Sequence, residues 1–173
     1  IYGSLELEGF TIKNTRGVTV NGDFSNNIIS IRKCIFINNT GSKGAAIFSN
    51  ALNGMLNISN CTFINNIPAA GGNGPIFLQN SNASIINNII WDNYPIEGLD
   101  TVNFNNIVKY NILKNESNWK QIDSTQGNIS DDPLFLNESE NNFNLTFYSP
   151  AIDAGDPNSP KDPDGTRADI GAL

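Results

Sequence analysis

The 173-residue sequence contains no histidine, two cysteines and only 10 lysines and arginines. Without histidine, neither Cys34 nor Cys61 has the base that usually activates a catalytic thiol. With 17 aspartates and glutamates the net charge is −7, so we expect no nucleic-acid binding and no attraction to anionic membranes. The chain also has no run of about 18 apolar residues and no charged-then-apolar leader, so we expect neither membrane insertion nor an export signal within it.

A nine-residue pattern recurs at a spacing of 27, at positions 31–39, 58–66 and 85–93, and a shorter relative starts 24 residues earlier at Leu7. A fixed period of this size is typical of a solenoid, in which each repeat buries its apolar face against its neighbours. Apolar residues alternate over short runs rich in Ile and Phe, which is the period of a strand. We therefore predict an all-β, right-handed parallel β-helix with coils of 24–27 residues over 1–113, and an irregular capping tail over 114–173 of the same domain.

In such a fold, equivalent positions of successive coils form columns about 4.8 Å apart. The period places like residues in each column, so we expect two inward stacks and one turn stack. The inward stacks are Ile12, Phe36, Phe63 and Ile90, and Ile31, Ile58 and Ile85; the turn stack is Asn39, Asn66 and Asn93. Amides stacked in this way hydrogen-bond along the column, and asparagine also tolerates left-handed backbone angles.

Cys34 and Cys61 occupy one column in adjacent coils. The spacing permits a disulfide, and two stacked buried thiols fit equally well. Parallel neighbouring Cβ vectors favour the stacked thiols.

Outward positions of the repeats are unusually apolar and need a cover or a partner. They form two columns: Ile35, Thr62 and Ile89, and Ile37, Ile64 and Trp91. The apolar residues of the tail are candidates for the cover: Leu134, Phe135, Phe143, Leu145 and Phe147.

The chain has 30 asparagines, and eight of them head an Asn-x-Ser/Thr sequon. These glycosylation candidates are Asn38, Asn57, Asn60, Asn82, Asn115, Asn128, Asn137 and Asn144. The number of sequons is mildly above that expected by chance. This excess favours an exported glycoprotein only if the source organism glycosylates asparagine.

Several motifs occur in a characteristic order. They are "GFTI" at 9–12, "IIWDN" at 89–93, "DPLF" at 132–135, "SPAIDAGDP" at 149–157 and "DPDGTRADIGA" at 162–172. In these motifs, most of the chain resembles the secreted and surface right-handed parallel β-helix repeat proteins of bacteria and archaea. The resemblance implies this fold and an extracellular or cell-surface location. It says little about activity, because the family includes adhesin-like proteins, surface-layer and anchored proteins and some polysaccharide lyases.

The acidic ending has two interpretations. Its carboxylates are the ligand type that calcium prefers, although a full twelve-residue calcium loop is missing. The tentative calcium ligands are Asp153, Asp156, Asp162, Asp164 and Asp169. Alternatively, Arg167 forms a salt bridge with Asp153 or Asp169 and locks the tail as a cap. The two are compatible; we expect no required cofactor, with calcium as the one candidate.

Catalytic residues are hard to assemble from this sequence. A β-helix lyase needs a basic cluster across coils, but only Arg32 and Lys33 are adjacent, and their column partners are uncharged. A glycoside hydrolase needs paired carboxylates, but Asp92 is the one acidic residue within the three 27-spaced segments. We therefore predict no catalytic residues.

The sequence favours a non-enzymatic extracellular structural or adhesive surface protein. The alternative is a carbohydrate-binding or polysaccharide-cleaving β-helix protein. The expected partners are other surface proteins, a polysaccharide or further copies of the chain. The first coil has no visible cap, so subunits with a natural terminus at Ile1 would associate head to tail into filaments. If the chain is an excised fragment, upstream coils or a cap have been removed, and both alternatives stay open.

Overall fold

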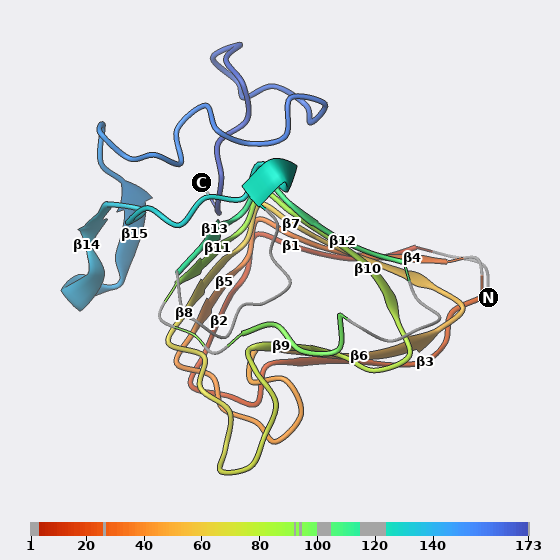
Figure 1. Cartoon of the computed structure of the whole chain (residues 1–173). Coiled ribbons are helices and arrows are strands. Elements are labelled where there is room, and N and C mark those ends of the chain that lie inside the picture. The colour runs from red at the N-terminus through yellow and green to blue at the C-terminus, as the bar shows by residue number, and fades with distance from the viewer. Residues whose placement is uncertain are drawn as a thin grey trace.

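The computed structural model describes residues 4–25, 27–91, 93, 95–99, 105–114 and 124–172. Three parallel sheets stack as a β-solenoid of about four turns, which confirms the predicted fold class. The sheets form the three sides of a triangular cross-section, and the C-terminal tail lies outside it (Figure 1). Among these residues no helix is long and apolar enough to cross a bilayer.

Each coil contributes one strand to each sheet in the first three turns. Sheet A contains β1 (Leu5–Glu8), β4 (Ile28–Arg32), β7 (Met55–Ser59), β10 (Asn82–Ile86) and β12 (Asn106–Lys109). Sheet B contains β2 (Thr11–Lys13), β5 (Ile35–Ile37), β8 (Thr62–Ile64), β11 (Ile89–Trp91) and β13 (Ile112–Leu113). Sheet C contains β3 (Val18–Asp23), β6 (Ile47–Leu52) and β9 (Ile76–Leu78).

The region after β13 contains the 3-10 helix η1 (Ser124–Gln126), an antiparallel hairpin of β14 (Phe135–Asn137) and β15 (Asn142–Leu145), and η2 (Glu138–Glu140) between the two hairpin strands. The solenoid reaches beyond the expected boundary at 113, because Ile129 still bridges to Ile112.

The predicted register is confirmed in sheets A and B. Leu7 pairs with Ile31 at an offset of 24, and Ile31 pairs with Ile58 at an offset of 27. In sheet C the offset is 29, as in the pairing of Ile47 with Ile76, because the turns that flank this sheet differ in length from coil to coil. The repeat that is visible in the sequence therefore belongs to two sides of the triangle.

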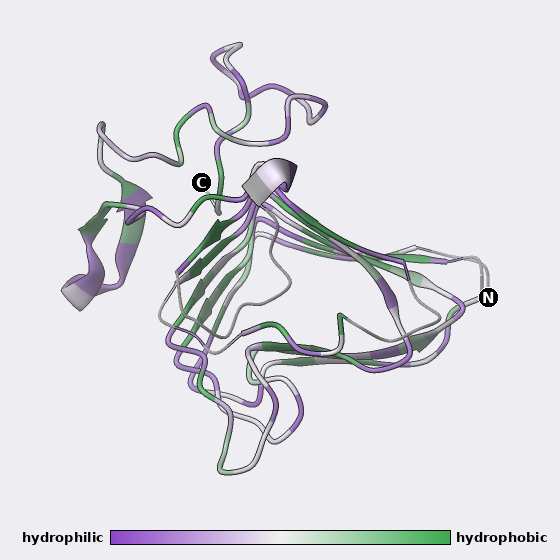
Figure 2. Ribbon diagram, viewed as in Figure 1, coloured by the Kyte–Doolittle hydropathy of each residue, from purple (hydrophilic) through white to green (hydrophobic). Residues whose placement is uncertain are grey.

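The inward columns form the core as expected. The rings of Phe36 and Phe63 stack with their centroids 4.8 Å apart and their planes 4° from parallel. Ile58 and Ile85 are fully buried, and Cys34 and Cys61 are buried free thiols. In Figure 2, hydrophobic segments lie in strands of all three sheets, with hydrophilic segments at many of the turns.

Asn39, Asn66 and Asn93 form a hydrogen-bonded ladder at the corner that follows sheet B. The Asn66 side-chain oxygen accepts from the backbone N–H of Asn39 at 3.2 Å and from its Nδ2 at 2.9 Å. Asn93 accepts from Asn66 in the same way, at 2.7 and 3.1 Å. Left-handed backbone angles occur one position earlier, at Asn38 and Asn65, so the ladder residues themselves do not use them.

A second ladder at the opposite end of sheet B was missed by the sequence analysis. Asn88, Asn111 and Asn128 are stacked, with Asn111 accepting from the N–H of Asn88 at 2.9 Å and Asn128 from that of Asn111 at 3.0 Å. The column continues upstream into the cysteines, because Asn88 also accepts from the N–H of Cys61 at 2.9 Å. Asn88 lies 27 residues after Cys61, which is the signal that could have revealed it.

We predict that Asn66→Ala lowers the free energy of unfolding by about 2–4 kcal/mol, because it leaves buried N–H and C=O groups without partners. These groups include the N–H of Asn39 and the carbonyl of Phe36. Asn50→Ala is the matched control, since Asn50 belongs to a ladder with Asn21 and Asn80 on an exposed surface, and it should cost less than about 1 kcal/mol. Urea unfolding measures both, and equal losses would contradict the structural role of the buried ladder.

Candidate functional site

The outer face of sheet B is covered by the tail. Ile37, Ile64, Ile89 and Ile112 are at most 4% exposed on this face. They pack in one apolar cluster with four tail residues, Phe135, Phe143, Ala151 and Ile170. The expected cover is therefore present, with Leu145 at its partly buried margin. Leu134 and Phe147 do not contribute, because they are 40% and 87% exposed.

Hydrogen bonds from the corner before sheet B hold the tail in place. The side-chain oxygen of Asn87 accepts from the N–H of Asp156 at 2.7 Å, and its nitrogen donates to the Ser159 hydroxyl at 3.1 Å. The carbonyl of Asn87 accepts from the N–H of Gly171 at 2.9 Å. One coil upstream, Asn60 donates to the carbonyl of Asp169 at 3.1 Å.

Two glycines of the closing motifs, Gly155 and Gly171, are required because the tail backbone lies close to neighbouring atoms there. A Cβ atom at Gly155 would lie 2.6 Å from the carbonyl oxygen of Ala168 and 3.1 Å from the amide of Asn87. One at Gly171, where φ is +107°, would lie 2.7 Å from Cδ1 of Ile89. The tail backbone can contact the solenoid only because these side chains are missing.

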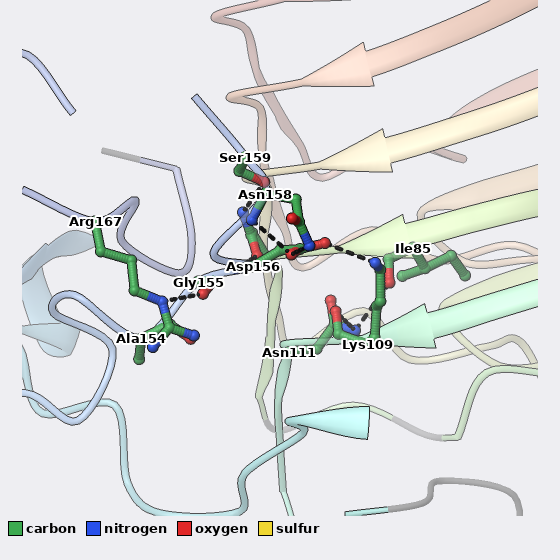
Figure 3. Close-up of polar contacts among 10 residues, drawn as sticks. Ile85, Lys109, Asn111, Ala154, Gly155, Asp156, Asn158, Ser159 and Arg167 are labelled. Carbon is green, nitrogen blue, oxygen red and sulfur yellow. Dashed lines mark hydrogen bonds and ion pairs between the residues drawn. The ribbon is translucent and has the colours of Figure 1, made fainter. Parts of the chain in front are cut away.

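Lys109 and Asp156 form an ion pair at the edge of this interface. Lys109, at the end of β12, places its Nζ 2.7 Å from Oδ2 of Asp156, which is 4% exposed (Figure 3). The backbone and side-chain nitrogens of Asn158 donate to the other carboxylate oxygen at 2.9 and 3.1 Å. Burial alone raises the pKa of Asp156, but hydrogen bonds from Lys109 and Asn158 outweigh burial, and the pKa falls below its usual value.

Arg167 holds the tail by different contacts from the ones predicted. Its Nε donates to the carbonyl of Gly155 and its Nη2 to that of Ala154 at 3.1 Å (Figure 3). The guanidinium also lies 5.6 Å from the ring centroid of Tyr110. It forms no ion pair with Asp153 or Asp169, so that prediction was wrong. Asp169 instead accepts a hydrogen bond from the N–H of Asp153 at 2.7 Å.

The structure divides the five candidate calcium ligands into two groups. Asp156 is paired with Lys109, whereas Asp153, Asp162 and Asp164 lie around Asp169. Burial, together with repulsion from those three carboxylates, raises the pKa of Asp169. Among the described residues, no group of three or more His, Cys, Asp or Glu side chains is arranged to hold a metal ion. Calcium binding at the tail therefore stays a prediction.

Several basic side chains of the solenoid are engaged in local contacts, whereas Lys13, Arg16 and Lys33 are exposed. Arg32 forms ion pairs with Glu6 and Glu8 of the first coil. The Nζ of Lys43 lies 5.3 Å from the ring centroid of Phe48. Asp92, the acidic residue of the third repeat, lies outside the described residues.

The sequons differ in accessibility. Asn38 and Asn144 are exposed, whereas Asn57, Asn60, Asn82 and Asn137 are partly buried. Asn128 is 7% exposed, and its Nδ2 donates to the carbonyl of Val108, so the folded chain cannot accept a glycan there. Asn115 lies outside the part of the chain that the structure describes.

No protein-family model, curated protein or solved structure matches this chain. The resemblance to surface β-helix repeat proteins therefore stays a prediction from the sequence motifs.

We predict opposite effects for two neighbouring aspartates of the tail at pH 7. Asp156→Asn should lower the free energy of unfolding by about 1–3 kcal/mol, because Lys109 loses its partner. Asp169→Asn, the matched control, should be neutral or stabilising by up to about 1 kcal/mol, because it removes repulsion and keeps an oxygen for the N–H of Asp153.

The pH dependence should follow the two pKa shifts. The stability from Asp156 is present above its unfolded-state pKa and is lost as the pH falls through its lower folded-state pKa, in the acid range below about pH 4. Asp169 behaves in the opposite way: the stability that it costs at neutral pH is recovered as the pH falls through its raised folded-state pKa. Urea unfolding between pH 3 and 7 tests both, and a loss for Asp169→Asn as large as that for Asp156→Asn would contradict the assignment.

Proposed function

We propose that the chain is a non-enzymatic structural or adhesive module of an extracellular or cell-surface protein. The observation that carries the proposal is the covered outer face of sheet B: the stripe that could receive a ligand is occupied by the chain's own tail. The extracellular location rests on the resemblance of the sequence motifs to surface β-helix repeat proteins.

The polar chemistry of the surface supports the same proposal. Polysaccharide lyases need a cation that can act on an acidic substrate. Here Arg32 is neutralised by two glutamates, and Lys109 is held by a nearly buried aspartate. Glu6 and Glu8 are likewise bound to Arg32, so they are not arranged as the acid and base of a glycoside hydrolase.

On the condition that no further coil precedes β1 in the natural protein, we further propose that copies of the chain associate head to tail. All strands of the three solenoid sheets are parallel, so the edge of the first coil has the orientation needed to continue the last coil of another copy. Leu5 and Phe10 of the first coil are 57% and 56% exposed, and Ile107 of the last coil is 43% exposed. Backbone pairing and apolar contact between these ends would extend the solenoid into a filament.

Sedimentation velocity and electron microscopy test the assembly. The unmodified chain should form oligomers that grow with concentration, whereas Leu5→Lys combined with Phe10→Lys should stay monomeric, because the added charges repel at the edge. Ile67→Lys is the control, since Ile67 is also 50% exposed but lies in the loop between β8 and β9, and it should assemble normally. If the unmodified chain were monomeric at every concentration, the head-to-tail proposal would be overturned.

A second test addresses catalysis. We expect no release of unsaturated uronides, followed by their ultraviolet absorbance, when the chain is incubated with pectin, alginate or glycosaminoglycans with and without calcium. Measurable release that depends on the folded chain would show a polysaccharide lyase and would refute the non-enzymatic proposal.

A further inference from the structure

The segment 127–131 adds one further layer to sheet B after β13. The N–H of Ile129 donates to the carbonyl of Asn111 at 2.9 Å, and its carbonyl accepts from the N–H of Leu113 at 2.9 Å. Both backbone groups of Ile129 therefore face the preceding coil, and those of the next residue, Ser130, are directed toward the downstream end of the solenoid. Among the described residues, no strand pairs with this segment on the downstream side.

At the other end of sheet B, β2 has an open edge that faces upstream. The carbonyl of Phe10 accepts from the N–H of Ile35 at 2.9 Å, so Phe10 faces β5. Thr11 and Lys13 alternate with it and direct their backbone groups away from β5. Within the described part of the chain, β2 has β5 as its one partner. The two ends of sheet B therefore present complementary edges of a parallel ladder.

The corner before sheet B defines the register between these edges, because every coil has a left-handed residue there. These residues are Gly9, Lys33, Asn60, Asn87, Tyr110 and Gly127. The first and last of them have almost the same φ, +73° and +74°. Continuing this column from one copy into another places 127–131 beside 9–13 of the next copy. Ile129 then lies beside Thr11, a neighbour pair of isoleucine and threonine that the same column already contains between β5 and β8.

Opposite charges come together in this register. The outward column that begins with Lys13 in β2 continues through Ile37, Ile64 and Trp91. Asp131 extends the same column at the downstream end, because it lies two residues beyond the bridge to β13. Both Lys13 and Asp131 are exposed, and neither forms an ion pair with another described residue.

We propose that an ion pair between Asp131 of one copy and Lys13 of the next fixes the register of the junction between them. The inference rests on the head-to-tail association proposed above, and it names the two segments and the two side chains that meet there. Neighbouring layers of a sheet are about 4.8 Å apart, a distance that lysine and aspartate side chains can span. Opposite charges at adjacent positions stabilise strand pairing, and like charges there oppose it.

The regions that contain the two ends also differ in net charge. Residues 1–43 have five lysines and arginines and three aspartates and glutamates, a net charge of +2. Residues 124–173 have nine aspartates and glutamates and two lysines and arginines, a net charge of −7. Attraction between unlike regions of two copies accelerates their association at low ionic strength and is screened as salt is added.

Zero-length carbodiimide coupling of the assembled chain tests the contact. The reagent activates a carboxylate, the neighbouring lysine amine attacks it to form an amide, and the reagent leaves as its urea. We expect covalent multimers in which peptide mass spectrometry finds Lys13 joined to Asp131. The two residues lie at opposite ends of sheet B in one chain, so this link must join two copies. Lys13→Arg keeps the charge but removes the reactive amine, and it should assemble without this cross-link.

Charge reversal measures what the pair contributes. Lys13→Asp or Asp131→Lys alone should weaken association about fivefold or more at low salt, because like charges then lie side by side. The two substitutions in one chain should restore it, since each junction again has one charge of each sign. Lys33→Asp is the matched control, because Lys33 is also exposed but lies one coil inside the solenoid, and it should assemble normally. Sedimentation velocity compares all of these chains.

The possible outcomes separate this inference from the proposal on which it rests. An unmodified chain that stays monomeric at every concentration overturns both. If the unmodified chain assembles but Lys13→Asp and Asp131→Lys associate as tightly as it does, the ion pair is refuted and the head-to-tail association stands. Intermolecular cross-links of Lys13 that never include Asp131 overturn the register in the same way.

Discussion

The stacking of parallel coils in register is the constraint on which the structure depends. It places each residue directly beside its equivalent in the next coil. A column must therefore consist of side chains that can pack on, or hydrogen-bond to, a like side chain. Apolar side chains satisfy this condition in the core, as the parallel rings of Phe36 and Phe63 show. At the corners the backbone turns away from the ladder, and buried N–H groups need another acceptor. Asparagine supplies that acceptor while donating to a carbonyl, and it therefore occupies both corners that flank sheet B.

Sheets A and B could be predicted from the sequence because their residues repeat at 24 and 27. The register of sheet C was not predicted, because its strands pair at an offset of 29 and not at the 27 of the repeated motif. The recurring Ile-Phe pairs at 47–48 and 76–77 carry this spacing in the sequence. The Asn88 ladder was missed for a different reason: its column begins with two cysteines, and thiol donors replace the amide donors there. A column is defined by its hydrogen bonds more than by its residue type.

The tail illustrates the limit of reasoning from charge. Its five aspartates and one arginine in the closing motifs predict either a metal site or an ion pair. In the structure the ion pair forms between Asp156 and Lys109, which lie 47 positions apart in the sequence. Arg167 donates hydrogen bonds to backbone carbonyls instead. These choices depend on where the loop crosses the solenoid, and that path follows from the packing of Phe135, Phe143 and Ile170 on sheet B. The sequence motifs of the tail predict that it is folded. Its packing on sheet B determines which of its side chains come into contact.

The asparagine rungs also have a direction. Asn39 donates to the carbonyl of Ile12, Asn66 to that of Phe36, Asn88 to that of Ile58 and Asn111 to that of Ile85, and in each of these bonds the carbonyl belongs to the preceding coil. The buried N–H groups of the same residues have their acceptor in the following coil, as when Asn39 donates to Asn66 and Asn88 to Asn111. Each new coil therefore satisfies the corners of the coil before it, so we expect the last turn of a chain that is still being synthesised to keep unsatisfied corner N–H groups until the next turn folds onto it.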